Sequence, residues 1–114
     1  MLFRSAVSAG RPAILDATYL KPAYRAPVLD LGRRLGASVA FVDVACPESV
    51  VRDRIAARSR EGSDPSDATF VVYRAQVAER EPFTREEAPL VVHHDGTAPP
   101  ESALMPLLEN VVSR

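Results

Sequence analysis

Residues 38–45, Ser-Val-Ala-Phe-Val-Asp-Val-Ala, form a nearly continuous apolar run that is rich in β-branched side chains. Such a run is typical of a parallel strand covered on both faces, because a half-exposed strand would alternate apolar and polar residues. Shorter apolar runs at residues 13–17 and 90–94 have similar character, and helical patterns separate the three runs. The alternation predicts an α/β fold with a parallel sheet and right-handed crossovers.

Helices are expected before, between and after these strands. Residues 2–9 predict a short helix that ends at Gly10. A second helix ends at Gly36 and begins either near Ala26, with Pro27 in its first turn, or at Pro22, with a kink at Pro27. Three further helices are expected at residues 47–60, 64–81 and 100–113.

Length and composition indicate one globular domain over residues 1–114, with 46% hydrophobic and 25% charged residues. The net charge of -1 gives no general attraction to nucleic acid or to an anionic membrane. No stretch approaches the roughly 20 apolar residues that span a bilayer, and the start lacks the pattern of a signal peptide. We therefore expect a cytoplasmic protein with no nucleic-acid or membrane partner. Cys46 is the only cysteine, which excludes an intramolecular disulfide.

The first strand delivers Asp16 and Thr18 at its carboxyl end, where open α/β sheets bind their ligands. Asp16 could order a magnesium-bound water or accept the proton of a substrate hydroxyl. The alternative is that Asp16 caps the following turn. Thr18 is either a substrate contact or a turn stabiliser.

Several arginines fall on the helix expected at residues 47–60. Arg54, Arg58 and Arg60 carry guanidinium groups that suit the paired oxygens of a phosphate. The alternative is a solvated helix face whose positive charges interact favourably with the helix dipole. The cluster is short and has no interleaved aromatic residues, so it does not indicate nucleic-acid binding. His93 and His94 are adjacent on a strand and point to opposite faces, so no metal site is expected there.

The motifs occur in a recognisable order. The segment Ile14-Leu15-Asp16-Ala17-Thr18 is followed by Arg25, and later segments are Cys46-Pro47-Glu48, Arg54-Ile55-Ala56-Ala57-Arg58, Gly62-Ser63-Asp64-Pro65-Ser66-Asp67-Ala68 and Gln76-Val77-Ala78-Glu79-Arg80-Glu81-Pro82. In order and spacing they resemble the C-terminal part of the AAA-type P-loop kinases, including those joined to aminoglycoside phosphotransferase-like domains. The similarity extends over roughly residues 2–96.

The resemblance implies a three-layer P-loop-NTPase-like fold that transfers a phosphoryl group from ATP, with Mg²⁺, to a small molecule of unknown identity. Residues 13–17 would take the place of the acidic strand beside the P-loop strand. Asp16 and Arg58 would be catalytic, and Thr18 and Arg25 would bind substrate. Arg54, Arg58 and Arg60 would bind phosphate from a mobile lid.

One expected motif does not occur among the 114 residues. Phosphate binding in this family uses a G-x-x-x-x-G-K-[ST] loop, and no glycine of the sequence begins that pattern. We therefore expect the C-terminal portion of such a kinase, a truncated fold with about three parallel strands in the order 1-2-3. On this view the chain alone is inactive and binds ATP weakly, and an N-terminal P-loop-containing segment or a homodimer completes it. The alternative is a non-catalytic homo-oligomeric or partner-binding module.

Overall fold

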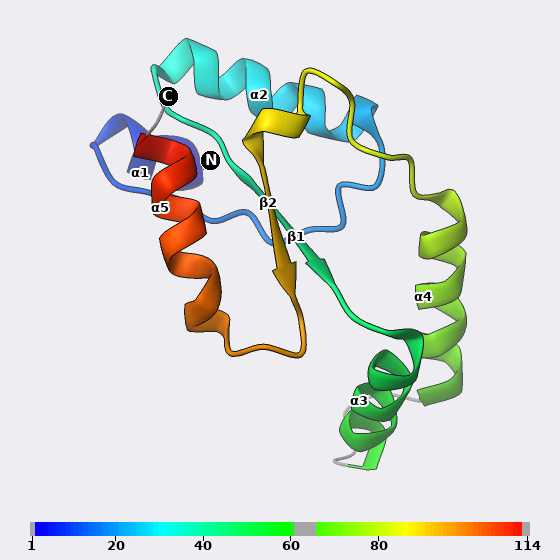
Figure 1. The fold of residues 1–114 in the computed structure, drawn as a ribbon. Coiled ribbons are helices and arrows are strands. Elements are labelled where there is room, and N and C mark those ends of the chain that lie inside the picture. The colour runs from blue at the N-terminus through cyan, green and yellow to red at the C-terminus, as the bar shows by residue number, and fades with distance from the viewer. Residues whose placement is uncertain (1, 61–65, 113–114) are drawn as a thin grey trace.

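The computed structural model describes residues 2–60 and 66–112. These residues form five α-helices and two strands, with two short 3₁₀ segments (Figure 1). The α-helices are α1 (Leu2–Ser8), α2 (Pro22–Leu35), α3 (Glu48–Arg60), α4 (Ser66–Glu79) and α5 (Leu104–Val112). The strands are β1 (Phe41–Ala45) and β2 (Val91–Asp95), and the 3₁₀ segments are η1 (Ala88–Leu90) and η2 (Pro100–Ala103).

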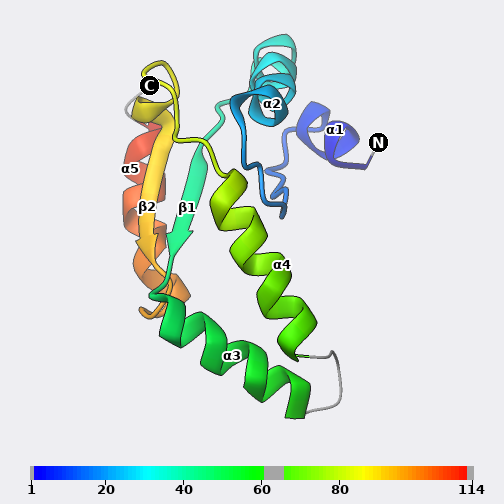
Figure 2. The same cartoon turned by 90° about the vertical axis from the view of Figure 1, so that its right-hand side faces the viewer.

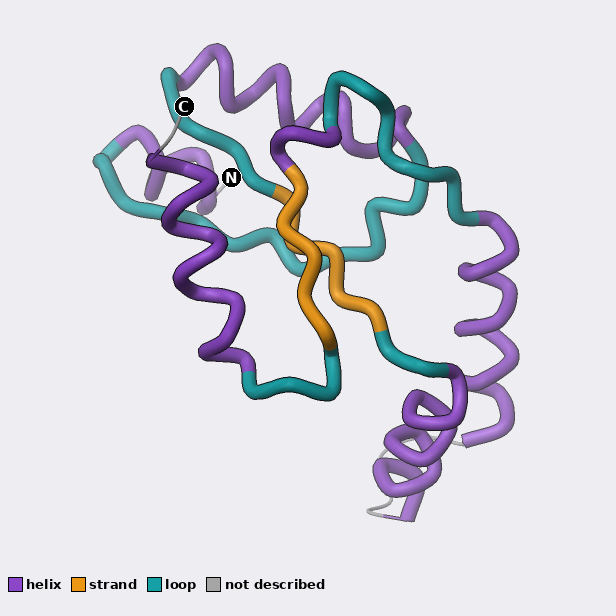
Figure 3. Tube along the Cα trace, in the orientation of Figure 1, coloured by secondary structure: helices purple, strands orange, loops and turns teal. Residues whose placement is uncertain are grey.

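The two strands pair in parallel, from Phe41 opposite Val91 to Ala45 opposite Asp95 (Figure 3). Parallel neighbours need a long connection between them, and α3 and α4 lie in this connection. Phe41 and Val92 are buried, whereas Val42 and Val44 are 42% and 57% exposed. The mixed helix and sheet architecture is thus confirmed, with its apolar core on only part of the sheet.

The strand predicted at residues 13–17 is wrong. Residues 11–20 contain neither helix nor strand, and the side chain of Ile14 is 93% exposed. The described residues therefore form a sheet of two strands, not of three. A strand exists only where a neighbour completes its backbone hydrogen bonds, and β1 pairs only with β2 in this part of the chain. The apolar character of residues 13–17 is consequently not enough to make a strand.

The predicted helices are present, with shifted ends. The second helix takes the earlier of its two possible starts, at Pro22, and contains Pro27. Gly36 ends it in the left-handed conformation, at φ 65° and ψ 28°. The predicted helix start at Asp64 and Pro65 lies outside the described residues. The last helix begins with the 3₁₀ segment η2 before α5.

The helices cover the sheet unevenly. Figure 2 shows α5 on one side of the strands and α1, α2 and α4 on the other. The helices α3 and α4 contact each other and project away from the sheet as a hairpin, which we call the lid hairpin. Within the described ranges, none of the helices combines the length and the apolar character that crossing a membrane requires.

Candidate functional site

The carboxyl ends of β1 and β2 meet where Cys46 and Gly96 follow the strands. The backbone N–H of Gly96 donates to the carbonyl oxygen of Ala45 at 2.8 Å. A Cβ atom at Gly96 would overlap the Sγ of Cys46, so the close approach of the two strand ends requires glycine there. Because both strands run in the same direction, this edge is where a ligand of an open α/β sheet is expected.

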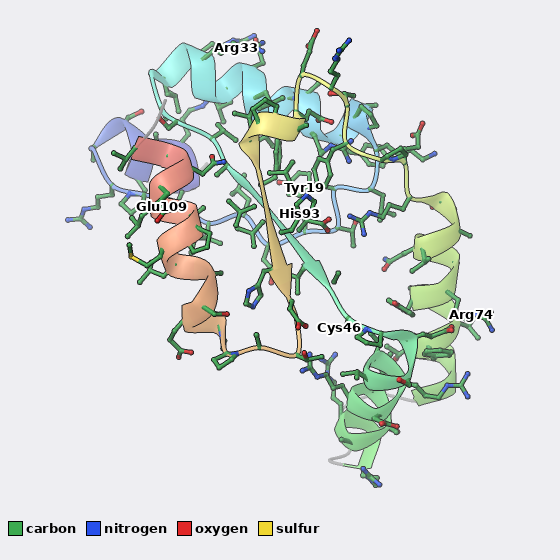
Figure 4. The ribbon with its side chains drawn as sticks, in the orientation of Figure 1. Tyr19, Arg33, Cys46, Arg74, His93 and Glu109 are labelled. Atoms are coloured by element: carbon green, nitrogen blue, oxygen red, sulfur yellow. The ribbon has the colours of Figure 1, made fainter. Side chains whose placement is uncertain are left out.

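Arg54 connects the lid hairpin to this edge. Its Nη2 donates to the carbonyl oxygen of Gly96 at 2.8 Å, and its Nη1 lies 3.5 Å from the Sγ of Cys46. Figure 4 labels Cys46 at the end of β1 and Arg74 on α4, the second helix of the hairpin. The guanidinium group of Arg54 thus anchors α3 to the ends of the strands.

Two further contacts hold the lid hairpin together. The Arg52 guanidinium lies over the Phe70 ring, 4.4 Å from its centroid, and Arg74 forms an ion pair with Glu48 at 3.3 Å. Both contacts join α3 to α4. The remaining predicted lid residues, Arg58 and Arg60, are exposed on the last turn of α3. The arginine side chains at the C-terminal end of α3 are therefore exposed to solvent.

Asp95 ends β2 at the same edge but is committed to a turn. Its Oδ1 accepts hydrogen bonds from the Thr97 hydroxyl at 2.7 Å and from the Thr97 backbone N–H at 2.8 Å. These two hydrogen bonds hold the pKa of the Asp95 carboxyl below its usual value, and the bond from the hydroxyl has the larger effect. The carboxylate shapes the loop between β2 and η2.

The predicted acid, Asp16, lies on an irregular segment and not at the end of a strand. Asp16 and Thr18 are exposed, on the segment between α1 and α2 that passes behind the sheet in Figure 1. A shallow pocket lies instead between β2 and α5 and contains none of the predicted site residues. It is lined by Val91, Val92, His93, Pro106, Glu109 and Asn110. This pocket does not bring Asp16 together with Arg58, so their common site stays a prediction.

Arg25 occupies an interior position, and its placement does not support a substrate contact. The residue is 1% exposed. Its Nε and Nη2 donate to the two carboxylate oxygens of Glu87 at 2.8 and 2.9 Å, and its Nη1 donates to the Tyr19 carbonyl oxygen at 2.9 Å. Nη2 also donates to the Pro82 carbonyl oxygen at 3.2 Å. Each guanidinium nitrogen of Arg25 already donates to an acceptor within the protein. In the structure Arg25 therefore holds segments of the fold together.

Glu87, the partner of Arg25, was not predicted from the sequence as a residue of interest. The hydrogen bond from Arg25 outweighs the cost of burial and lowers the pKa of Glu87 to about 2. Thr84 and Glu87 also exchange hydrogen bonds, from the Thr84 N–H to the carboxylate at 2.8 Å and from the Glu87 N–H to the Thr84 hydroxyl oxygen at 3.1 Å. The Thr-x-x-Glu spacing is the capping-box pattern, so the sequence did contain a signal for this local structure.

Asp43 is a half-buried acid that the sequence analysis did not single out. Its carboxylate lies 2.6 Å from the Nη2 of Arg80 and 3.3 Å from the Nδ1 of His93. The acid therefore joins the end of the lid hairpin to both strands. An aspartate inside an otherwise apolar strand was the available signal, because a carboxylate in that setting needs a partner.

Comparison with known proteins places these observations in a family. A family model described as an AAA domain matches residues 1–83, well over half of the chain. The chain belongs to this AAA-domain family. As a member it is an AAA-type, P-loop-kinase-like and NTPase-related domain, and its coarse fold is P-loop-NTPase-like. The matched region of the AAA domain contains the Asp16 segment and the lid hairpin. No curated protein and no solved structure gives a significant match to the chain.

Proposed function

We propose that this AAA domain contributes the acceptor side and the lid of a P-loop phosphotransferase that uses ATP and acts on a small molecule. The observation that carries the proposal is the family match, which includes the acid-bearing segment and the arginine-bearing hairpin in one collinear stretch. A nucleotide-binding role follows the family at the coarse level, and phosphoryl transfer is the specific proposal.

The proposed roles follow from the side chains. Bound Mg²⁺ would neutralise charge on the ATP phosphates. Asp16 is exposed and carries a carboxylate that would hold a magnesium-bound water or accept the acceptor hydroxyl's proton. Arg58 and Arg60 would neutralise charge on the transferred phosphoryl group from the hairpin. Thr18 would contact the acceptor, and Arg54 would both contact phosphate and anchor the lid.

The chain needs a phosphate-binding loop to perform this reaction. Its 114 residues contain no G-x-x-x-x-G-K-[ST] pattern, and that loop provides the backbone amides and the lysine that bind the β- and γ-phosphates. We therefore propose that a P-loop-containing segment completes the site, and that the 114-residue chain alone is inactive and binds ATP weakly.

The first test measures ATP binding by calorimetry and γ-phosphate release by the purified 114-residue chain. We expect neither tight binding nor enzyme-like turnover. Enzyme-like turnover that Asp16→Asn abolishes would refute the claim of inactivity.

A second test joins the chain to the strand, P-loop and helix of an active AAA-type kinase. Phosphate release that depends on Asp16 and Arg58 is expected, and Asp30→Asn on α2 is the matched control because Asp30 is an exposed acid outside the proposed site. Activity that survives both Asp16→Asn and Arg58→Ala would reject the assigned roles.

A second candidate function is a non-catalytic module that binds a partner or a second copy. The observation that favours this function is an exposed surface larger than that of an average monomer of the same mass. The chain exposes 8400 Å², whereas a folded monomer of 12.4 kDa exposes about 6100 Å² on average. The excess is larger than the roughly 800 Å² that each partner buries in a standard interface.

Apolar side chains contribute to this excess. They include Val42 and Val44 on β1 and four residues of α5 that are 48–80% exposed, namely Leu104, Met105, Leu108 and Val112. Light scattering after size exclusion tests the module. We expect assembly that Val44→Lys weakens and that Val71→Lys, an equivalent change on the lid hairpin, leaves intact. A monodisperse monomer at all concentrations, with no binding of an apolar dye, would count against self-assembly.

A further inference from the structure

The segment that carries Asp16 has an unusual backbone conformation at its end. Tyr19 has φ 43°, and among the described residues it is the one non-glycine residue with positive φ. The left-handed conformation costs roughly 1–2 kcal/mol for a residue with a Cβ atom. Such a conformation persists only where surrounding contacts hold it. The contacts around Tyr19 therefore determine how the segment is placed.

Arg25 supplies one of these contacts directly. Its Nη1 donates to the Tyr19 carbonyl oxygen at 2.9 Å, which fixes the peptide that follows the strained residue. The next carbonyl oxygen, that of Leu20, accepts a hydrogen bond from the Glu81 backbone N–H at 2.9 Å. Two successive carbonyl groups of the acid-bearing segment are thus held, that of Tyr19 by Arg25 and that of Leu20 by the backbone just after the lid hairpin.

The same guanidinium holds the other side of this junction. Its Nη2 donates to the Pro82 carbonyl oxygen at 3.2 Å, and its Cζ lies 4.5 Å from the centroid of the Phe83 ring. Pro82 and Phe83 follow α4 by only a few residues. One side chain therefore contacts both the segment after Asp16 and the base of the lid hairpin.

Glu87 fixes the guanidinium in turn. The pair is bidentate and its two residues are 1% and 4% exposed, so water does not compete for these hydrogen bonds. The bidentate geometry restricts the plane of the guanidinium, which a single contact or a lysine ammonium group would not do. The orientation of Nη1 toward Tyr19 depends on that plane.

We infer that Arg25 is a positioning residue, which sets the conformation of residues 16–20, holds them to the base of the lid hairpin, and is itself oriented by Glu87. This inference rests on the proposed function only for the roles of Asp16 and the lid. The coupling between the two segments is a property of the fold and can be measured without ATP.

Amide hydrogen exchange, followed by NMR at single residues, tests the coupling in the intact chain. Arg25→Lys and Glu87→Gln should each accelerate exchange of the Glu81 amide by about tenfold or more, because the Leu20 carbonyl group that protects it loses its support. The Gly96 amide, which donates to the Ala45 carbonyl oxygen at the strand ends, reports the general loss of stability that the variants also cause, and its exchange should accelerate by a clearly smaller factor.

Arg34→Lys is the matched control, because Arg34 lies on the same helix in an exposed ion pair with Asp30. It should leave exchange at Glu81 unchanged. Unchanged exchange at Glu81 in both test variants would overturn the inference. An equal acceleration at Glu81 and Gly96 would also overturn it, because the pair would then act on Glu81 only through the stability of the fold as a whole.

The backbone strain gives a second readout that a general loss of stability would not produce. Glycine adopts positive φ without strain, so a chain with Tyr19→Gly should depend less on Arg25. We expect Glu87→Gln to accelerate Glu81 exchange by a smaller factor in the Tyr19→Gly background. An equal factor in both backgrounds would contradict the role of Arg25 in holding Tyr19.

If Arg25→Lys does not fold, Glu87→Gln alone carries the comparison. Coupling without phosphoryl transfer in the completed protein would reject the proposed function and leave this inference intact.

Discussion

At the scale of single residues, the Arg25–Glu87 pair shows how a buried charge is tolerated. Taking either ion out of water costs several kcal/mol, and the bidentate contact with additional carbonyl acceptors offsets that cost. Removing one partner leaves the other buried and unpaired. The pair is therefore more sensitive to mutation than an exposed pair of the same chemical type.

Arg25→Ala should lower the free energy of unfolding by about 3–5 kcal/mol. The exposed Arg34, in its ion pair with Asp30 on the same helix, is the comparison, and Arg34→Ala should cost less than about 1 kcal/mol. Urea denaturation of the two variants measures the difference. Equal losses of stability would show that burial of Arg25 has no special weight.

The pH dependence of stability follows from Glu87. The pKa of Glu87 is about 2 in the folded protein, against 4.5 for a glutamate in an unfolded chain, so the folded state favours the ionised form. The contribution is complete above pH 4.5 and is lost as the pH falls from there toward 2, with a total of about 3 kcal/mol. Urea denaturation at pH 6 and pH 3 should show a smaller difference for Glu87→Gln than for the wild type. An identical difference would mean that Glu87 does not cause the acid sensitivity.

At the scale of elements, α2 illustrates a conflict between helix propensity and packing. Gly32 lies in the interior of the helix and is buried, where alanine is normally favoured by about 1 kcal/mol. A Cβ atom at this position would overlap the Cγ2 of Val39 and approach the Ala37 carbonyl oxygen to 3.3 Å. The glycine allows the chain to turn back closely from α2 toward β1.

Gly32→Ala should therefore destabilise the protein by about 1–3 kcal/mol despite its gain in helix propensity. Thermal unfolding followed by circular dichroism measures the effect. Ala23→Gly, at an exposed position near the start of the same helix, is the control and should cost less than about 1 kcal/mol through propensity alone. A more stable Gly32→Ala variant would show that Val39 can move away at little cost.

At the scale of the whole molecule, the chain is less compact than a typical domain of its length. Its radius of gyration is 16.0 Å, whereas a compact chain of 114 residues has about 13 Å. The lid hairpin projects from the sheet, and a sheet of two strands provides few positions that helices can cover on both faces. Phe41, Ile55 and Val92 are the buried hydrophobic residues of the described core.

Such a core should give low stability. We expect a free energy of unfolding below about 5 kcal/mol for the chain at low concentration, at the lower end of the range for small domains. Urea denaturation at several protein concentrations checks this value. Stability that rises with concentration would support the homo-oligomeric module, and a concentration-independent value above about 10 kcal/mol would contradict the expectation.

The sequence predicted the elements whose stabilising contacts are local. Helical hydrogen bonds join residues four apart, so periodic apolar residues and Gly36 were enough to predict α2 and its end, while the structure decided between its two possible starts. The same holds for α3 and α4, and the apolar runs identified β1 and β2. The candidate acid and the lid arginines were proposed from residue types in a particular order, and their roles stay predictions.

Only the tertiary structure decided what lies beside these elements. Residues 13–17 have the composition of a strand, but a strand requires a partner whose position no local pattern encodes, and β1 pairs with β2 instead. The resemblance to the kinases assigned Arg25 to substrate, whereas in the structure its guanidinium is paired with Glu87, which lies 62 residues away along the chain. Contacts between distant segments depend on how the whole chain packs, which is why the sequence specified the helices and the folded molecule specified the sheet and the buried ion pair.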